Sequence, residues 1–403
     1  MQTNIPQNIL NTPEGEEANR ILRSCVHCGF CTATCPTYQE LGDELDGPRG
    51  RIYLIKDMLE GGEVSVTTQK HLDRCLTCRA CETTCPSGVE YAHLLAIGKA
   101  EVEKRVARSL WQKMQRAVLL SVLPHSKRFA FFLGLARLFR PVLPAHLAAK
   151  IPQTSQTKIS AYPKTQHARS VLLIEGCVQP VMSPEIDVHT AKVLDVLGIS
   201  VKRTGVAQCC GAVEHHMNAH EQSLVRMRAN IDAWIPYLDA GAEAILSTAS
   251  ACALEIKEYG YELRNDVDYA EKAKRIAEAA KDLVEVLAAE DLSALKLKAP
   301  QRIAFHSPCT LQHGQKLNGR VEEVLTSIGY ELAPVKDGHL CCGAAGTYTI
   351  LQPELSTTLR DNKVEALTSH QPELIATANI GCLHQLQSGS DVPVQHWVSL
   401  LTR

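Results

Sequence analysis

The chain has 403 residues, of which 45% are hydrophobic and 21% charged, and its formal net charge is −2. This composition excludes a largely disordered chain, and the longest apolar runs, near residues 117–123 and 129–139, are too short to span a bilayer. The first 15 residues have neither the positive start nor the apolar centre of a secretory signal, so we expect a cytoplasmic protein.

Sixteen cysteines are the unusual feature of the composition. In a reducing cytoplasm, so many thiols favour metal binding over disulfides, and the alternative is a set of scattered core cysteines. Their spacing and the charge pattern divide the chain into four regions. Residues 1–103 hold eight cysteines, residues 104–168 form a basic linker, and residues 169–299 and 300–403 hold four cysteines each.

Residues 1–103 contain the strongest motif, C-x2-C-x2-C-x3-C-P, in two copies. This is the bacterial ferredoxin pattern for [4Fe–4S] clusters, in which the fourth cysteine of each run ligates the other cluster. A structural zinc site is the rival interpretation, but zinc needs four ligands and no such run. The motif predicts two [4Fe–4S] clusters in a helical ferredoxin-like domain. The expected ligands of the first cluster are Cys25, Cys28, Cys31 and Cys85, and those of the second are Cys75, Cys78, Cys81 and Cys35.

Four other polar side chains lie inside or near these motifs: His27, Arg49, Arg51 and Arg79. Because four cysteines already suffice for each cluster, we expect His27 to be a surface or backbone-bonded imidazole and not a ligand. The arginines either raise the cluster potentials through their charge or are simply solvated.

The stretch from Lys104 to Arg169, which spans the basic linker, contains 13 Lys and Arg and no Asp or Glu. Apolar residues such as Leu110 and Met114 recur at helical spacing, which predicts an amphipathic helix within residues 104–150. Such an element either lies on an anionic membrane surface or packs on a partner subunit or on the repeats. Nucleic-acid binding is the weakest option, because no reader motif accompanies the charge.

Residues 169–299 and 300–403 form an internal repeat, in which the first three cysteines are offset by 132 residues and the last by 130. In each copy, a strand-like run precedes the first cysteine, a helix ending at Gly198 or Gly329 follows, and a later strand precedes the last cysteine. This alternation predicts a small parallel-sheet α/β unit per copy, with its cysteines at one edge of the sheet. An apolar pattern over residues 269–289 of the first copy predicts one further packing helix.

The cysteines of each copy follow the pattern C…CCG…C. Glycine allows a tight turn beside a bulky group, so this pattern suits a thiolate cage; a vicinal disulfide and packed thiols are the alternatives. We expect one or two further iron–sulfur clusters here, with candidate ligands Cys177, Cys209, Cys210 and Cys252 for a third and Cys309, Cys341, Cys342 and Cys382 for a fourth. Nearby histidines are candidate ligands or proton relays, although a structural role is the expectation for each: His215, His216, His313, His339 and His384.

The chain has no G-x-G-x-x-G, Walker A, H-E-x-x-H or G-x-S-x-G motif. A protein without a flavin or nicotinamide fingerprint but with many thiolate sites is suited to passing electrons and not to taking a hydride from a substrate. We therefore expect another chain to supply the substrate chemistry, and no catalytic residue in this one.

The segments CVHCGFC (25–31), GPRGRIY (47–53) and LDRCLTCR (72–79), together with the two CCG repeats, resemble the iron–sulfur subunits of bacterial glycolate oxidase (glycolate dehydrogenase) over nearly the whole chain. The resemblance implies a complex with two FAD-binding-type subunits, where a flavin on a partner oxidises glycolate to glyoxylate. Electrons would then cross the clusters of this chain to a non-oxygen acceptor, expected to be membrane quinone.

The CCG repeats also resemble those of heterodisulfide reductase, whose fullest form has a fifth cysteine in a terminal C-x2-C. The corresponding positions here carry other residues: Ala249, Glu255, Asn379 and Gln385. This departure argues against a self-contained disulfide-reducing catalyst and permits a four-ligand cluster. A related lactate or glycerol-3-phosphate dehydrogenase subunit and a zinc-stapled scaffold stay open as alternatives.

Overall fold

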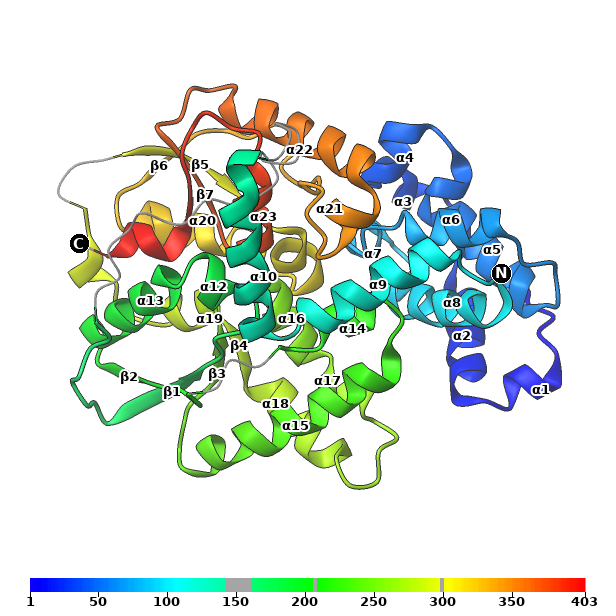
Figure 1. The fold of residues 1–403 in the computed structure, drawn as a ribbon, viewed down its shortest axis with the longest axis horizontal. Coiled ribbons are helices and arrows are strands. Elements are labelled where there is room, and N and C mark those ends of the chain that lie inside the picture. Colours follow the sequence, from blue (N-terminus) through cyan, green and yellow to red (C-terminus); the bar gives the residue numbers. More distant parts are fainter. Residues whose placement is uncertain (143–160, 206–208, 298–300, 403) are drawn as a thin grey trace.

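The computed structural model describes residues 1–142, 161–205, 209–297 and 301–402. The N-terminal domain is helical and lies at one end of the molecule (Figure 1, blue). Its longer helices are α2 (Pro13–Ser24), α5 (Pro48–Leu59), α6 (Val66–Asp73) and α8 (Tyr91–Arg105). Short helical segments connect them: α1 (Gln7–Leu10), α3 (Phe30–Ala33), α4 (Pro36–Leu41), η1 (Glu44–Asp46) and α7 (Ala80–Thr84).

Side chains from α2, α5 and α8 form the core of this domain, with Ile21, Ile55 and Leu94 fully buried. Gly98 brings α8 close to α5, since a Cβ added at Gly98 would lie 2.6 Å from Cγ1 of Ile55. The packing of these helices holds the two cysteine-bearing loops between them at fixed positions.

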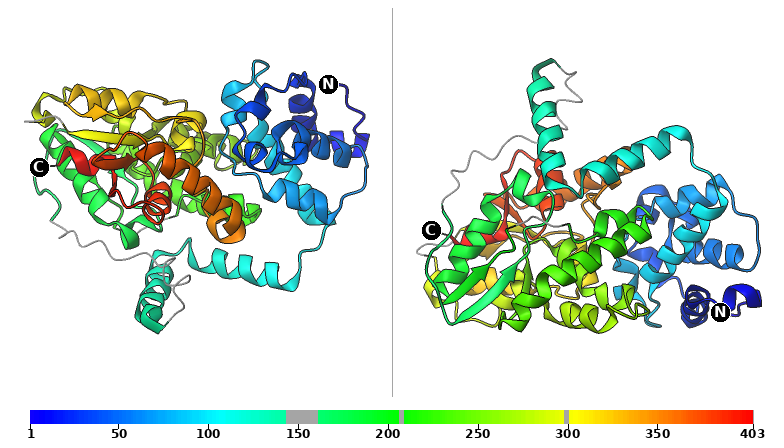
Figure 2. Two further views of the ribbon diagram at one scale, coloured as in Figure 1. Left: turned by 90° about the horizontal axis from the view of Figure 1, so that it is seen from above. Right: turned by 60° about the horizontal axis from the view of Figure 1, so that its bottom comes forward.

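Two amphipathic helices, α9 (Leu110–Val122) and α10 (Ser126–Phe139), follow the N-terminal domain, and η2 (Arg140–Val142) ends this described stretch. They run along the outside of the body (Figure 2), so the helical expectation for this region is met as far as the description extends. Residues 143–160 of the basic linker lie outside the described residues. Within the described ranges no single helix is long and apolar enough to cross a membrane; α9 and α10 meet the length and composition criteria only together, and they bend by 113° at the break between them.

Two four-stranded parallel sheets form the rest of the molecule. The first has the order β2-β1-β3-β4 and the second the order β6-β5-β7-β8, so the two units share one topology. The first sheet contains β1 (Arg169–Leu173), β2 (Ile199–Lys202), β3 (Ile245–Ser247) and β4 (Ala280–Asp282). The second contains β5 (Arg302–His306), β6 (Glu331–Leu332), β7 (Leu374–Thr377) and β8 (Val394–His396). The predicted fold class, a ferredoxin-like helical domain followed by two α/β units, is confirmed.

Helices cover both sheets (Figure 1). Those of the first unit are α12 (Gln179–Met182), α13 (Glu185–Val196), α14 (Ala212–His216), α15 (His220–Asp239), α16 (Ser250–Lys257), α17 (Tyr259–Glu262), α18 (Ala270–Ala279), α19 (Leu283–Leu287) and η3 (Ser293–Leu295). Those of the second unit are the π-helical turn η4 (Thr310–Gly314), α20 (Arg320–Ser327), α21 (Tyr348–Leu351), α22 (Pro353–Thr368), α23 (Ile380–Gln387) and η5 (Trp397–Leu401).

The single helix predicted over residues 269–289 is wrong. The chain forms α18, then the edge strand β4, then α19, and β4 pairs in parallel with β3. The side chain of Asp282 caps the new helix by accepting from the backbone N–H of Val284. The apolar periodicity did not reveal this break, because an available sheet edge overrides local propensity.

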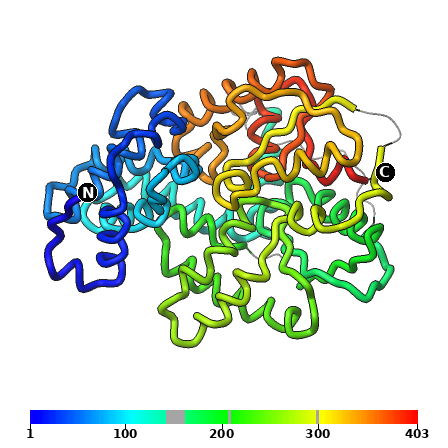
Figure 3. The backbone as a smooth tube through the Cα atoms, turned by 180° about the vertical axis from the view of Figure 1, so that it is seen from behind, coloured from blue at the N-terminus to red at the C-terminus, as the bar shows by residue number. Residues whose placement is uncertain are grey.

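The two units share one apolar core. Leu194 of α13, Leu287 of α19 and Leu325 of α20 are all fully buried in the same cluster. A backbone hydrogen bond from Ser250 N–H to the Ala378 carbonyl, at 3.2 Å, also joins the units. Figure 3 shows the units next to each other (green, and yellow to red), with the N-terminal domain at one end of both.

Candidate metal centres

The two ferredoxin-type loops share an unusual backbone path. His27 and Gly29 in the first loop, and Thr77 and Arg79 in the second, all have positive φ values between 52° and 85°. These left-handed residues alternate with the cysteines and curl each loop, so that its first three thiols face the same side. A short helix, α3 or α7, then carries the third cysteine.

The fourth cysteine of each run leaves the loop. Cys35 and Cys85 are both extended, with ψ near 113° and 115°, because a residue before proline is disfavoured in the helical region. The chain therefore turns away from its own loop and places the thiol beside the other one.

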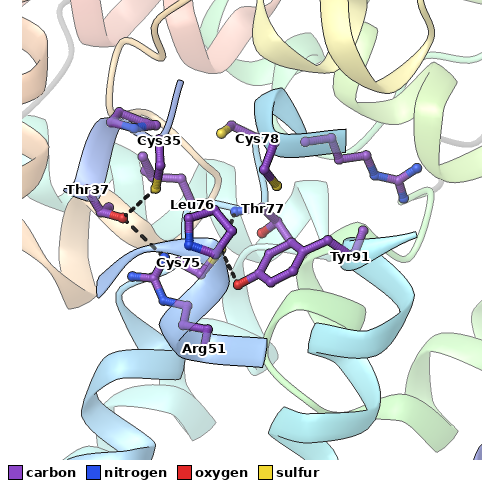
Figure 4. Close-up of a pocket in the computed structure, with 13 residues that line it drawn as sticks. Cys35, Thr37, Arg51, Cys75, Leu76, Thr77, Cys78 and Tyr91 are labelled. Atoms are coloured by element: carbon purple, nitrogen blue, oxygen red, sulfur yellow. Dashed lines mark hydrogen bonds between the residues drawn. The ribbon is translucent and has the colours of Figure 1, made fainter. Parts of the chain in front are cut away.

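The resulting grouping is the crossed one that the motif predicts. One cavity is lined by Cys25, Cys28, Cys31 and Cys85. A second cavity is lined by Cys35, Cys75, Cys78 and Cys81 (Figure 4). We call these the first and second N-terminal sites. Cys81 also reaches the wall of the first, so the two sites are neighbours.

The donor set of the second site fits a cationic cluster better than free thiols. Burial first, and the neighbouring cysteines second, raise the pKa values of Cys78 and Cys81 well above the ordinary value. In the first site, burial and Cys25 raise the pKa of Cys31 to about 11. So many close, desolvated thiols become thiolates together only when a cationic metal centre, such as an iron–sulfur core, neutralises them. All 16 cysteines are free thiols and available as ligands.

Arg51 forms part of the wall of the second site and is only 1% exposed. Its guanidinium donates to the His71 carbonyl at 2.8 Å and to Thr37 Oγ1 at 3.2 Å, and Thr37 Oγ1 lies 3.3 Å from Cys35 Sγ (Figure 4). Burial opposes the charge of Arg51, but anionic groups led by Cys75 raise its pKa above the ordinary value. Arg51 is therefore a fixed buried cation at this site and not a solvated side chain.

The other polar residues near the motifs divide between the sites. Arg49 lines the first site and donates to Glu44 at 2.6 Å. Arg79 lines the second site and donates to Glu258 of the first α/β unit at 2.6 Å. The His27 ring packs against Tyr53 with ring centroids 4.5 Å apart, and neither ring nitrogen has a hydrogen-bond partner among the described residues. The expectation of a surface or backbone-bonded imidazole at His27 is not met.

In both α/β units, the cysteines lie beyond the carboxyl ends of the strands, as the repeat pattern predicts. Cys177 and Cys309 follow β1 and β5, and Cys252 and Cys382 each occupy the third residue of a helix, α16 or α23, after the next strand of the sheet. The vicinal pairs end at Gly211 and Gly343, whose φ values are 99° and 80°. A Cβ added at Gly343 would lie 2.6 Å from the Ser356 carbonyl oxygen, so glycine is required there.

The thiols of each unit gather into one group. In the second unit, Cys309 Sγ lies 3.9 Å from Cys341 Sγ, and interacting thiols link Cys341 to Cys342 and Cys342 to Cys382. In the first unit, the same chain of contacts runs through Cys177, Cys209, Cys210 and Cys252. We call these groups the first and second CCG sites.

A pair of serines supports the two CCG turns in the same way, and the sequence analysis did not identify it. Ser223 Oγ donates to the Gly211 carbonyl at 3.2 Å, and Ser356 Oγ donates to the Gly343 carbonyl at 2.8 Å. Each serine lies 12 or 13 residues after its glycine. Alignment of the two repeats at the glycines places Ser223 opposite Leu355, one residue before Ser356, so the sequence pattern alone does not reveal the pair.

Most histidines named near these cysteines bond elsewhere. His215 Nδ1 pairs with Glu255 at 2.9 Å, His313 contacts Thr83 Oγ1 at 3.1 Å, and His384 contacts Ser183 Oγ at 3.3 Å. His216 stacks on His215, and burial lowers its pKa to about 4. For His339, the contact found among the described residues is between its backbone carbonyl and His313 Nε2. The structure instead places His306, which sequence analysis did not single out, against the second CCG site, with Cys342 and Cys382.

The second N-terminal site adjoins the second CCG site. Leu76, Cys78, Cys309, Cys341 and Tyr348 belong to one apolar cluster. The Tyr348 hydroxyl donates to the Arg74 carbonyl at 2.9 Å, which fixes the two parts of the molecule against each other. After burial, Cys309 is the largest influence on the raised pKa of Cys78, so thiols of the two sites face each other closely.

Comparison with known proteins agrees with this architecture. A family model described as a 4Fe-4S dicluster domain matches residues 21–89, and a model described as a cysteine-rich domain matches residues 171–257 and 303–387. The chain is 54% identical over 401 residues to the "Glycolate oxidase iron-sulfur subunit" of Escherichia coli (strain K12), covering 100% of this chain and 98% of that protein. The chain belongs to the family of glycolate oxidase iron–sulfur subunits.

Two further relatives are less similar to this chain. The "Probable glycolate oxidase iron-sulfur subunit" of Bacillus subtilis (strain 168) is 30% identical over 91% of this chain and 89% of its own length. "Lactate utilization protein A" of Geobacillus thermodenitrificans is 27% identical, covering 57% of this chain and 98% of its own length. As a member of this family, the protein is an iron–sulfur electron-transfer subunit of an oxidoreductase.

Proposed function

We propose that this chain is the electron-transfer subunit of a multisubunit, flavin-dependent glycolate dehydrogenase. The observation that carries the proposal is the arrangement of eight thiols into two crossed groups of four, the second of which adjoins another thiol group. The name of the Escherichia coli relative supports glycolate as the substrate. In this scheme, two FAD-binding-type partners take two electrons and two protons from glycolate, which leaves glyoxylate.

The two N-terminal sites are proposed to bind one [4Fe–4S] cluster each, through the cysteines that line each cavity. The two CCG sites are proposed to bind a third and a fourth cluster. When bound, such clusters accept and release single electrons. The protein's own residues supply the thiolates and hold a fixed charge, Arg51, at the second N-terminal site.

The contacts suggest an order for the sites. The first and second N-terminal sites share the wall formed by Cys81, and the second shares an apolar cluster with the second CCG site. We propose that electrons pass along these three sites in sequence. The first CCG unit touches the N-terminal domain through polar contacts, Arg79 and His93 to Glu258, and forms a side branch of the path.

Cluster content of the anaerobically reconstituted full chain tests the assignment. Two [4Fe–4S] clusters account for about eight iron atoms, and we expect more than that in the unaltered chain. The paired substitution Cys309→Ser and Cys382→Ser should remove the excess iron of the second unit and leave the N-terminal iron in place. A colourless chain that binds zinc and no iron would refute the proposal.

The identity of the substrate can be tested in the assembled complex. Glycolate should reduce the clusters of this chain, as seen by electron paramagnetic resonance, whereas lactate and glycerol 3-phosphate should do so far more slowly. Faster reduction by lactate would move the protein to the function named for its Geobacillus relative. Disulfide reduction by the isolated chain would instead support an independent catalyst at the CCG sites.

The acceptor is proposed to be membrane quinone, and the protein to be peripheral on the cytoplasmic face of the membrane. The supporting feature is the set of exposed side chains on α9 and α10: Trp111 is 66% and Leu138 71% exposed, and Lys113 and Lys127 on the same two helices are also exposed. Exposed aromatic and aliphatic side chains among basic ones suit an anionic lipid surface. A partner subunit that covers the same surface is the alternative outcome.

Vesicle binding separates these outcomes. The full chain should bind phosphatidylglycerol vesicles at low salt and dissociate at high salt, and Trp111→Ser should weaken binding. Val267→Ser is the matched control, because Val267 is 99% exposed in the loop before α18, far along the chain from α9. Absence of binding at every salt concentration would refute the membrane contact.

A further inference from the structure

His306 is a buried side chain whose polar atoms have no partner. It ends strand β5, three residues before Cys309, and is 2% exposed. Neither Nδ1 nor Nε2 has a hydrogen-bond partner among the described residues. A buried polar group left unsatisfied costs about 1–3 kcal/mol, so such a group in a folded protein calls for an explanation.

The surroundings of His306 supply one. A ring nitrogen of His306 and the Sγ atoms of Cys342 and Cys382 all lie within 4.8 Å of one another, and all three residues are buried. That is the spacing of donors around a shared metal centre. The remaining donors of this site, Cys309 and Cys341, are linked to the same group through contacts between thiols.

The first CCG site provides an internal comparison. Ile174 is three residues before Cys177, as His306 is before Cys309. Ile174 is 5% exposed and packs in an apolar cluster with Cys210. One backbone position therefore carries an alkyl side chain in one repeat and an unpartnered imidazole in the other, so burial by itself does not require a histidine there.

The two positions where a fifth cysteine could stand in the second repeat are occupied by Asn379 and Gln385. Asn379 Nδ2 donates to Cys382 Sγ at 3.6 Å, which orients the thiol but offers no thiolate. Gln385 Nε2 donates to the backbone carbonyl and the hydroxyl of Ser356. Among the described residues, His306 is the side chain that can take up a fifth coordination role at this site.

We propose that His306 ligates an iron of the cluster in the second CCG unit, so that this unit has four thiolates and one imidazole, whereas the first unit has thiolates only. The inference rests on the proposed function, because it presumes a cluster in the second unit. The ligand set and the hydrogen bonds around it tune the potential of an iron–sulfur centre. The second CCG site would then differ in potential from the first, at the point where it adjoins the N-terminal sites.

Nitrogen hyperfine coupling on the reduced clusters is the direct test, using the full chain labelled with ¹⁵N-histidine. His306→Ile copies the first repeat, and His306→Cys keeps a metal donor where the isoleucine variant fails to fold. His384→Gln is the matched control, because His384 lies on α23 two residues from Cys382 but bonds to Ser183. We expect a directly bonded nitrogen signal in the unaltered chain and in His384→Gln. His306→Ile and His306→Cys should lose it, and His306→Ile should also shift one midpoint potential.

Two results would overturn the inference, and iron analysis distinguishes them. If the second unit contains a cluster but the nitrogen signal is absent, or persists in both His306 variants, then His306 is not a ligand and the proposed function stands. If the chain contains only the iron of the two N-terminal sites, the inference fails together with the assignment of clusters to the CCG units.

Discussion

We predict that the buried guanidinium of Arg51, at the second N-terminal site, contributes strongly to the stability of the protein. Arg51 is 1% exposed and its ion-pair partner Asp46 is 0% exposed. Asp46 also accepts from Arg74 at 2.8 Å and lies 3.0 Å from His71 Nδ1. Arg51→Met removes the most deeply buried of these three partners of Asp46 and two further hydrogen bonds, while it retains most of the side-chain volume.

The cost of this substitution follows from the geometry. Removal of one partner from a buried ion pair costs about 3–5 kcal/mol, because the remaining charge stays desolvated. The Arg51–Asp46 separation is a long 3.4 Å, and Arg74 and His71 stay in place. We therefore expect the lower end, about 3 kcal/mol, which is a large fraction of the 5–15 kcal/mol that stabilises a typical protein.

Chemical denaturation of the anaerobic, cluster-loaded chain, followed by circular dichroism, measures this effect. Arg49→Met is the control, because Arg49 is a partly exposed arginine that pairs with Glu44 at the first site, and its loss should cost under about 1 kcal/mol. Asp46→Asn should reduce the cost of Arg51→Met, with a coupling of about 0.5–3 kcal/mol.

The same variants have a redox readout. Loss of the Arg51 charge should lower the midpoint potential of the second N-terminal site and leave that of the first nearly unchanged. Two results would refute the reasoning from burial. One is an equal loss of stability in Arg51→Met and Arg49→Met, and the other is a loss of stability in Arg51→Met that Asp46→Asn does not alter.

Three shorter predictions follow from other contacts. Cys35→Ser should empty the second N-terminal site, and Cys85→Ser should empty the first, although each cysteine belongs to the motif that supplies the other site. The two variants should therefore lose different paramagnetic resonance signals. Loss of the same signal from both variants would exclude crossed ligation. Gly98→Val should destabilise the chain by about 1–3 kcal/mol through its clash with Ile55, as measured by denaturation, and Ile55→Ala should relieve part of that cost. Burial opposes the charged form of His215, but nearby carboxylates raise its pKa to about 9. The stabilising effect of the His215 charge should therefore be complete below pH about 6.5 and lost as the pH rises through 9. A difference in stability between wild type and His215→Gln that does not change over this pH range would contradict the prediction.

The grouping of the N-terminal thiols was predictable because its cause is local. Two prolines after Cys35 and Cys85 restrict the backbone of the cysteines themselves, and the spacing of the other cysteines determines a single curled loop. The left-handed conformations of Thr77 and Arg79 were not predictable, since neither residue favours positive φ and only the surrounding packing holds them there.

The missed features are those that depend on residues far apart in sequence. Strand β4 exists because β3 offers it an edge, and the apolar spacing of residues 269–289 holds no information about that edge. His306 was missed for a similar reason. In sequence it precedes Cys309, but in space it lies against Cys342 and Cys382, which are 36 and 76 residues further along the chain.

The two repeats have one topology but different neighbours, which explains how their sites can differ in chemistry. The second repeat contacts the N-terminal domain through Tyr348 and through His313, which bonds to Thr83 beside the second N-terminal site. The first repeat contacts that domain through the Arg79–Glu258 ion pair, between charged side chains and not between thiol groups. Only the repeat whose thiols share an apolar cluster with the second N-terminal site carries an imidazole at the strand end, where the other has Ile174. The two repeats therefore contain two thiol cages, and contact with the N-terminal domain distinguishes the one that we propose to lie on the direct path for electrons.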